Sequence, residues 1–309
     1  RSSRTPQPWR QKVSRRLLRR RSPTREDTRA NARAMKVTPS MLRRVVVFGG
    51  SGYVGSAIAR ALTLATTSPA VKATTQTTSS DAAKADAKAD ASDAVDIVCA
   101  SRTGAPPSWA RDEPWAARAR WVKCDALDVA QCQETVRGAT AVVTAIGGLP
   151  FPWLKAEEIV RTNGATNVIP GRAAMEEGVR RLVVVGASIP PFVPGLASYA
   201  EGKAQVEAFA RDEFASESNG RRAFILKPAA VSGTRRMGGG VTLPLSLVMD
   251  PTRAILRACG GALVENAPVP LENVARAAVK AALDDAYGND GFTMITNKSL
   301  IEDFGGEVA

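Results

Sequence analysis

Short apolar runs alternate with amphipathic stretches along the chain from residue 44 onward. The apolar runs are RVVVF (44–48), VDIVCASR (95–102), ARWVKCDAL (119–127), TAVVTAIGG (140–148), RRLVVVGAS (180–188) and RAFILKPAAV (222–231). Their consecutive β-branched and apolar residues are typical of parallel strands that are covered on both faces. Apolar residues at helical spacing predict helices directly after the first run and near 128–137, 155–178 and 197–218. This alternation predicts an α/β fold with a doubly wound parallel sheet.

Two segments depart from this alternation. Residues 66–94 are low in complexity and nearly free of large apolar side chains, which predicts an insertion that adds nothing to a core. After residue 231 the alternation weakens, and helices are expected near 244–258 and 270–286. We therefore expect three parts: a basic N-terminal arm (1–43), a sheet domain (44–231) and a small C-terminal α/β lobe of the substrate-binding type (232–309).

The net charge of +12 is concentrated in the N-terminal arm. Residues 1–44 hold fifteen basic and two acidic residues, a net charge of +13, and the remainder of the chain carries −1. An Arg- and Ser-rich segment of this kind is typical of an organellar targeting sequence, or of a mature arm left after an upstream presequence is removed. Its partner is expected to be anionic. Nucleic acid is the less favoured choice, because no aromatic platform or known binding module accompanies the arm.

The composition excludes several kinds of chemistry. The chain contains no histidine, which excludes histidine-based acid–base catalysis, Ser-His-Asp triads and histidine-ligated metals. The cysteines (Cys99, Cys124, Cys132 and Cys259) form no C-x-x-C pair, so we expect no metal site, no disulfide framework and a reducing compartment. No run of about eighteen apolar residues occurs, so we expect no transmembrane helix.

Three glycines separate the first predicted strand from the first predicted helix. Gly49, Gly52 and Gly55 permit a sharp turn and a close approach of the backbone to a ligand. The N-terminus of the following helix provides unpaired N–H groups and a partial positive charge, which suit a pyrophosphate. We therefore predict a dinucleotide site here that includes Ser51, Tyr53 and Val54. A glycine-rich turn without a ligand is the alternative.

Later strand ends add residues to the same predicted crevice. After the second strand, Ser101 and Arg102 offer donors and a positive charge, which favour the 2′-phosphate of NADP over the bare ribose of NAD, unless Arg102 only belongs to a solvated loop. After the third strand, Asp125 could meet the adenine edge. After the fourth, Gly147 and Gly148 would let the backbone pass close to the cofactor, and Ala145 belongs to the same predicted cofactor-binding set.

The fifth predicted strand is followed by candidate catalytic residues. Tyr199 and Lys203 are four residues apart, so on a helix they share one face. A neighbouring ammonium is expected to lower the pKa of the Tyr199 phenol from its usual value near ~10. Tyr199 is then a candidate proton donor to a carbonyl oxygen that receives hydride, with Ser188 orienting that oxygen.

An ordered series of segments resembles the extended and atypical short-chain dehydrogenase/reductases, including NmrA-like proteins. The segments are GGSGYVG (49–55), RTNGATNV (161–168), GVRRLVVVGAS (178–188), YAEGK (199–203), LKPAAVSG (226–233) and VPLENVARAAVKAAL (269–283). The resemblance implies a Rossmann fold that binds NADPH, with the pyrophosphate at the three glycines and the ribose end at Arg102. It also implies that Ser188, Tyr199 and Lys203 are catalytic, that Lys203 contacts the cofactor, and that Pro228 and Val231 border the nicotinamide.

The segment KPAAVSGTRRMGGGVTLPLSLV (227–248) resembles an organellar subgroup of this family. That subgroup includes a coenzyme-Q-biosynthesis protein of fungal mitochondria and flavin-reductase-related proteins of plastids, and the NAD(P)H-binding accessory subunit of respiratory complex I is a close cousin. The resemblance implies a cofactor-bound accessory subunit on the matrix side of the mitochondrial inner membrane. Its partners would be other subunits and, through residues 1–43, anionic lipid. The alternatives are an active NADPH-dependent reductase of a quinone-like or isoprenoid carbonyl compound, and a plastid location.

Two features depart from the family pattern. One is the insertion at 66–94, and the other is the pair Pro190 and Pro191 directly after Ser188. These prolines are expected to hold Ser188 away from Tyr199, which would leave a bound cofactor without turnover. The basic arm favours the accessory-subunit hypothesis, whereas the complete Ser-Tyr-Lys set favours the reductase.

Overall fold

The computed structural model describes residues 43–66, 95–189, 195–236, 242–259, 265–288 and 291–306. All of them belong to the unit Leu42–Ala309. Most of the arm (1–42), most of the insertion (67–94), and Pro190 and Pro191 lie outside the described residues. The predictions made for those segments therefore remain predictions.

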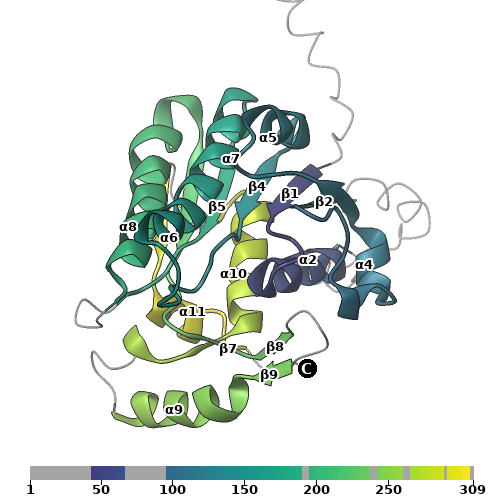
Figure 1. Ribbon diagram of the computed structural model, residues 1–309. Helices are drawn as coiled ribbons and strands as arrows, with labels where there is room; N and C mark the ends of the chain where they lie inside the picture. Colours follow the sequence, from purple (N-terminus) through teal and green to yellow (C-terminus); the bar gives the residue numbers. More distant parts are fainter. Residues whose placement is uncertain are drawn as a thin grey trace, which may run out of the picture. The chain divides into compact units, whose positions relative to one another are not determined.

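Seven parallel strands form the central sheet in the order β11-β6-β5-β4-β1-β2-β3 (Figure 1). Their bounds are β1 Arg43–Phe48, β2 Val95–Ser101, β3 Arg120–Lys123, β4 Ala141–Thr144, β5 Arg181–Val185, β6 Arg222–Leu226 and β11 Gly291–Ile295. The chain winds outward from β1 to β3 and then returns to place β4 on the other side of β1. The predicted doubly wound parallel sheet is confirmed, and its winding reverses between β1 and β4, where such sheets bind ligands.

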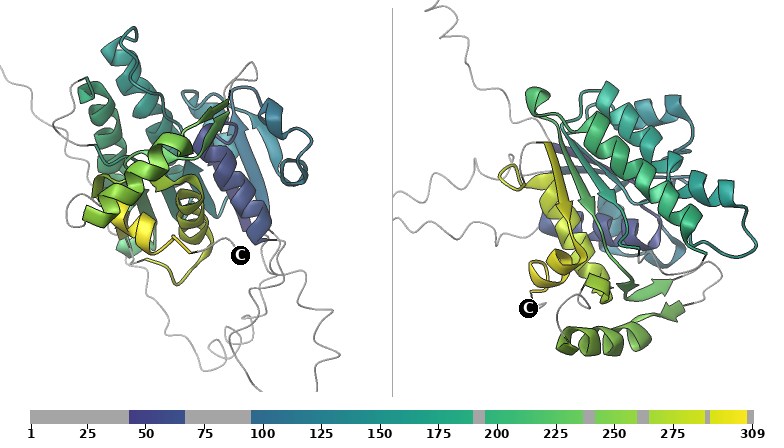
Figure 2. Two further views of the ribbon diagram at one scale, coloured as in Figure 1. Left: turned by 90° about the horizontal axis from the view of Figure 1, so that it is seen from below. Right: turned by 90° about the vertical axis from the view of Figure 1, so that its left-hand side faces the viewer.

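Helices cover both faces of the sheet. They are α2 Tyr53–Ala65, α4 Pro114–Arg118, α5 Val129–Val136, α6 Ala156–Asn163, α7 Ala165–Glu176, α8 Ala197–Ala208, α9 Ser246–Cys259, α10 Leu271–Leu283 and α11 Asn297–Glu302. The right-hand view of Figure 2 shows α8 on one side of the sheet and α10 on the other. None of the helices in the described segments is long and apolar enough to cross a membrane.

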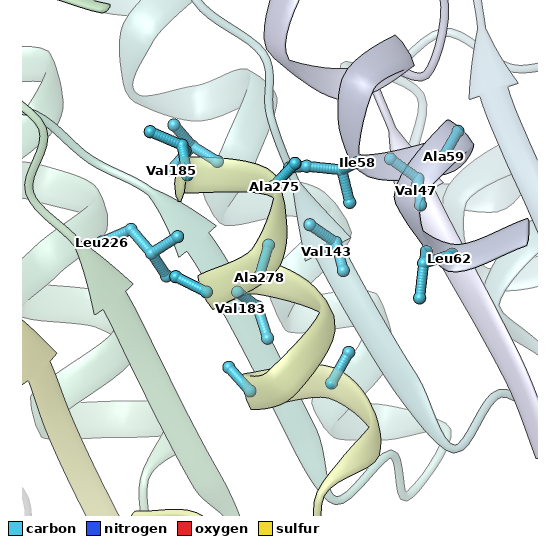
Figure 3. Close-up of a cluster of buried hydrophobic side chains, with 14 of the residues drawn as sticks. Val47, Ile58, Ala59, Leu62, Val143, Val183, Val185, Leu226, Ala275 and Ala278 are labelled. Atoms are coloured by element: carbon cyan, nitrogen blue, oxygen red, sulfur yellow. The ribbon is translucent and has the colours of Figure 1, made fainter. Parts of the chain in front are cut away.

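Successive residues of each strand point to opposite faces of the sheet and belong to two separate hydrophobic cores. Val45 and Val47 of β1 pack with α2 and α10, and Val46 and Phe48 pack on the opposite face with α5, α7 and α8. Figure 3 shows the first core, in which Val47 lies near Ile58 of α2. This two-sided burial explains why the strands are apolar at consecutive positions.

Two predicted helices are shorter than expected. The helix expected at 155–178 is divided into α6 and α7 at Gly164, where a Cβ would lie 2.6 Å from Gln205 Oε1 and 2.9 Å from Val160 O. The helix expected at 197–218 ends as α8 at Ala208 and continues as one π-helical segment, Phe209–Phe214. At Gly164 the close packing against α8 leaves no room for a side chain, which the apolar spacing does not reveal.

The segment expected to form the C-terminal lobe is partly built into the main domain. Its strand β11 joins the sheet, and its helix α10 packs on one face of the sheet. Outside the sheet this segment forms short pairs and α9; the pairs are β7 (Val231–Ser232) with β10 (Val269–Pro270), and β8 (Thr234–Arg236) with β9 (Thr242–Pro244). At the other end, Arg43 belongs to β1, and its guanidinium binds the carbonyl of Leu283 and the carboxylate of Asp285.

Candidate functional site

The three glycines after β1 form a tight turn into α2. Gly49 has φ +79°, and its carbonyl accepts a hydrogen bond of 2.8 Å from the N–H of Gly52. A Cβ on Gly55 would lie only 2.0 Å from Gly49 O, so the turn itself excludes a side chain at this position. A Cβ on Gly52 would lie 3.1 Å from the same oxygen and contact no other atom closely. Gly52 is exposed, so its lack of a side chain leaves space for a ligand.

The N-terminus of α2 is open toward this turn. Gly52 is the N-cap residue, and no side chain accepts a hydrogen bond from the first turn of the helix. The first-turn N–H groups have no intrahelical acceptor and carry the positive end of the helix dipole. Half-buried Ser51 and Val54 flank Gly52. These observations fit the pyrophosphate of a dinucleotide.

Tyr53 begins α2, but its phenol packs against the C-terminal segment. A Cβ on Gly233 would lie 2.8 Å from Tyr53 Oη, which is buried and has no hydrogen-bond partner in the described residues. Burial, with a smaller contribution from Glu272, raises the pKa of Tyr53 to about 12. The guanidinium of Arg235 lies 5.8 Å from the centroid of the Tyr53 ring. The side chain of Tyr53 therefore connects the glycine turn to β8.

Of the two residues predicted at the end of β2, one is exposed and the other is buried. Arg102 is exposed, whereas Ser101 is buried and its hydroxyl accepts a 3.2 Å hydrogen bond from the N–H of Gly104. Ser101 therefore holds the turn that displays Arg102. Lys123, paired with Ser101 across β2 and β3, adds a second exposed cation that the sequence analysis missed. Lys123 lies at the end of β3, next to Ser101 at the end of β2. The sequence alone does not show that these two strands pair, so it gave no reason to choose Lys123.

The end of β3 places Asp125 at the surface. One carboxylate oxygen of Asp125 accepts a 3.0 Å hydrogen bond from the N–H of Leu127, and the N–H of Asp125 donates to Gln131 Oε1 at 2.9 Å. Asp125 thus begins a hydrogen-bonded loop that leads into α5, with its carboxylate near the same strand-end edge of the sheet.

The end of β4 brings the predicted cofactor residues against α6 and α8. Ala145 lies beside the glycine turn, since a Cβ on Gly49 would be 2.9 Å from Ala145 O. A Cβ on Gly147 would lie 3.1 Å from Asn163 Oδ1 and 3.5 Å from Lys203 Nζ. The lack of a side chain at Gly147 therefore lets Asn163 and Lys203 lie close to the backbone of this loop. The predicted approach of the cofactor to the same backbone stays a prediction.

Asn163 is a functional candidate that the sequence analysis did not single out. It is fully buried at the end of α6, and it binds both the N–H and the carbonyl of Gly148 at 3.1 Å. Its amide also donates to Ile159 O at 2.9 Å. Asn163 thereby fixes the loop after β4 beside the catalytic candidates. The quoted segment RTNGATNV contains this residue and was the available signal.

Tyr199 and Lys203 lie on α8, as predicted. Lys203 Nζ is 5.9 Å from the centroid of the Tyr199 ring and donates a 3.0 Å hydrogen bond to Val185 O at the end of β5. Burial lowers the pKa of Lys203 to about 8 and raises the pKa of Tyr199 above its usual value. The expectation that Lys203 lowers the pKa of Tyr199 is therefore wrong, because desolvation dominates both groups.

Ser188, Pro228 and Val231 lie at neighbouring strand ends. The N–H of Ser188 donates to Pro228 O at 2.8 Å, which ties the loop after β5 to the loop after β6. Val231 continues this second loop and pairs with Val269. A cavity of about 140 Å³ adjoins Lys203 between α8 and the ends of β5 and β6, and Ala187 and Ile189 line it.

Comparisons with known proteins agree with this arrangement. Residues 106–213 match the protein family described as NAD(P)H-binding. An uncharacterized chloroplastic protein of Arabidopsis thaliana is 29% identical over 258 residues, which cover 79% of this chain and 73% of that protein.

Solved structures resemble the fold at low sequence identity. A short-chain dehydrogenase/reductase family oxidoreductase from Burkholderia thailandensis has a TM-score of 0.54 at 14% identity, covering 84% of this chain and 93% of its own. The Bordetella bronchiseptica enzyme WbmH in complex with NAD⁺ has a TM-score of 0.50 at 18% identity, covering 82% of this chain and 75% of its own.

Together these similarities identify the fold. The fold is the Rossmann-like fold that the short-chain dehydrogenase/reductases also have. The match of residues 106–213 to an NAD(P)H-binding family is consistent with a nicotinamide cofactor. The Arabidopsis relative is described as chloroplastic, and the location of this chain, mitochondrial or plastid, stays a prediction. The described residues contain no cluster of three or more potential histidine, cysteine or carboxylate metal ligands.

Proposed function

We propose that the protein is an NADPH-dependent reductase that acts in a plastid on a quinone-like or isoprenoid carbonyl compound. The observation that carries this proposal is the pair of half-buried Tyr199 and buried Lys203 on α8, with Lys203 beside Gly147 and in the lining of the cavity at the strand ends. The chloroplastic relative supports the location. Bound NADPH would supply the hydride.

The residues of the chain can handle the accompanying proton. Because burial raises the pKa of Tyr199, its phenol stays protonated at neutral pH and can donate a proton to the substrate oxygen. Lys203, with its pKa lowered to about 8, can hold or release a proton in the physiological range. Ser188 would orient the same substrate oxygen, and Arg102 with Lys123 would attract the 2′-phosphate of the cofactor.

Substitution of Tyr199 tests the reductase hypothesis. With NADPH and a panel of quinones and aldehydes, Tyr199→Phe should lower kcat by ~10²–10⁴-fold, as expected for loss of a general acid, without changing the Kd of NADPH. Tyr287→Phe is a matched control, because Tyr287 stacks on Phe224 at 5.9 Å within the core. Absence of turnover in the wild-type protein, or equal activity in the two variants, would contradict the proposal.

A second candidate is a cofactor-bound accessory subunit of a membrane assembly, including one of the mitochondrial complex I type. The observation that favours it is an exposed aromatic pair in the loop after β4: Phe151 and Trp153 stack at 4.6 Å, and Trp153 is 75% exposed. The basic arm would add attraction to anionic lipid.

Co-purification from organelle membranes distinguishes this candidate from the reductase. The full chain should migrate in a large complex, and Trp153→Ser or deletion of residues 1–42 should release it while NADPH binding persists. Migration of the wild-type protein on its own would contradict the accessory role.

A further inference from the structure

Cys124 and Cys132 lie together although seven residues separate them in the sequence. Cys124 follows β3 directly, and Cys132 lies in the first half of α5. Each thiol lies 3.7 Å from the same acceptor, the carbonyl oxygen of Asp125. The two sulfurs therefore share one acceptor atom. Both are free and buried.

We propose that Cys124 and Cys132 form a peroxide-sensitive dithiol, whose oxidation to a disulfide weakens dinucleotide binding through Asp125. The first part of this proposal depends only on the thiol geometry. The second part rests on the proposed cofactor site.

The surroundings assign different roles to the two sulfurs. Hydrogen bonding from Cys132 lowers the pKa of Cys124 to about 7, and the same contact together with burial raises the pKa of Cys132. Cys124 is therefore the thiolate that reacts first, because the thiolate is the nucleophilic form. Cys99 has no such neighbour, and burial raises its pKa to about 12.

The oxidation proceeds in two balanced steps. The Cys124 thiolate attacks one oxygen of hydrogen peroxide, the O–O bond breaks, and the departing hydroxide takes a proton to give water and a sulfenic acid on Cys124. The sulfur of Cys132 then attacks Cys124 Sγ, the S–O bond breaks, and a second water leaves. Two thiols lose two electrons, and one peroxide is reduced to two waters. An external dithiol can reduce the disulfide again.

Burial selects a small oxidant. Cys124 is 2% exposed and Cys132 is 0% exposed, so the disulfide of another protein cannot reach either sulfur without opening α5. Hydrogen peroxide is about the size of two water molecules, and the neighbouring loop is exposed at Leu127 and Val129. The geometry therefore favours peroxide over exchange with a protein disulfide.

Oxidation acts directly on Asp125. The carbonyl of Asp125 loses both thiol donors when the disulfide forms, while its N–H stays bound to Gln131. The loop from Asp125 to α5 must then readjust, and its carboxylate is the predicted contact of the adenine. We expect NADPH affinity to fall about five- to tenfold, the loss expected for roughly one net hydrogen bond.

Mass spectrometry of the full chain tests the dithiol. Trypsin cuts after Lys123 and Arg137, so both cysteines occur in the single peptide 124–137. Peroxide treatment should lower the mass of this peptide by two hydrogens and block its alkylation, and dithiothreitol should reverse both changes. Cys124→Ser and Cys132→Ser should abolish the change, and Cys99→Ser should leave it intact. Two thiols that stay fully alkylatable, or that oxidise irreversibly without pairing, would overturn the proposal.

Calorimetric titration of the reduced and oxidised protein with NADPH tests the coupling. Weaker binding only after oxidation, absent in Cys132→Ser, is the expected result. Equal affinities in the reduced and oxidised protein would overturn the coupling. If the reduced protein does not bind NADPH, the proposed cofactor site and the coupling both fail, while the disulfide is judged by the mass measurement alone.

Discussion

Replacing Lys203 with methionine should remove a pH dependence from the folding stability. Burial lowers the pKa of Lys203 from its ordinary 10.5 to about 8. Between these two values the unfolded chain binds more protons than the folded protein, so the free energy of unfolding of the wild type rises with pH. A pKa difference of one unit corresponds to about 1.36 kcal/mol. The charged form of Lys203 therefore lowers the free energy of unfolding by about 3 kcal/mol below pH 8, and this loss disappears above pH 10.5.

Methionine keeps the length and apolar volume of the side chain but carries no charge. The lost hydrogen bond from Lys203 Nζ to Val185 O, 3.0 Å long, changes the stability of the variant by an amount that hardly varies with pH. This offset is about 1–3 kcal/mol. Between pH 7 and pH 10 the wild type should therefore gain roughly 2–3 kcal/mol relative to Lys203→Met.

Urea unfolding followed by tryptophan fluorescence at several pH values measures this difference. Lys155→Met serves as the control, because Lys155 is exposed at the start of α6 and its replacement should not alter the pH dependence. A stability difference between the wild type and Lys203→Met that stays constant from pH 7 to pH 10 would refute the reasoning. It would mean that the ammonium remains solvated, and the proton-transfer role assigned to Lys203 would lose its basis.

Two further predictions concern the cofactor end and the loop after β4. Arg102→Ala should weaken NADPH binding by about tenfold and leave NADH binding unchanged, because only the 2′-phosphate needs this exposed cation; equal losses in calorimetric titrations with both cofactors would argue for a role in the loop alone. Asn163→Ala should lower the free energy of unfolding by about 1–3 kcal/mol, because the half-buried N–H and carbonyl of Gly148 both lose their partner. A change below about 0.5 kcal/mol in urea unfolding would contradict this estimate.

The sequence predicted the sheet because its inner strands, such as β1, β4 and β5, are buried on both faces. Consecutive apolar residues such as Val45, Val46 and Val47 are recognisable without knowing what packs on them. The last strand, β11, has the less regular sequence GFTMI and starts at Gly291 with φ +92°. Its place in the sheet is set by pairing with β6, which local patterns do not reveal.

The sequence predicted which residues lie at the strand ends and on α8. It did not predict the properties of these residues that depend on tertiary packing. The spacing of Tyr199 and Lys203 placed them on one helix face, but the spacing carries no information on burial, which sets the direction of both pKa shifts. The pairing of Cys124 with Cys132 was missed for a similar reason. A strand end and a helix bring these thiols together, and no C-x-x-C spacing marks the pair.

Titration of the purified protein with NADPH, in the wild type and in Gly52→Val, tests the central claim that the turn before α2 holds a dinucleotide. Gly52 has φ −79° and ψ 174°, a conformation open to other residues, and it is exposed, so the variant should fold. The valine side chain would occupy the space assigned to the pyrophosphate. We expect saturable NADPH binding to the wild type and none to Gly52→Val at the same cofactor concentrations, with unchanged circular dichroism. NADPH binding of equal affinity to both folded proteins, or none to either, would contradict the account.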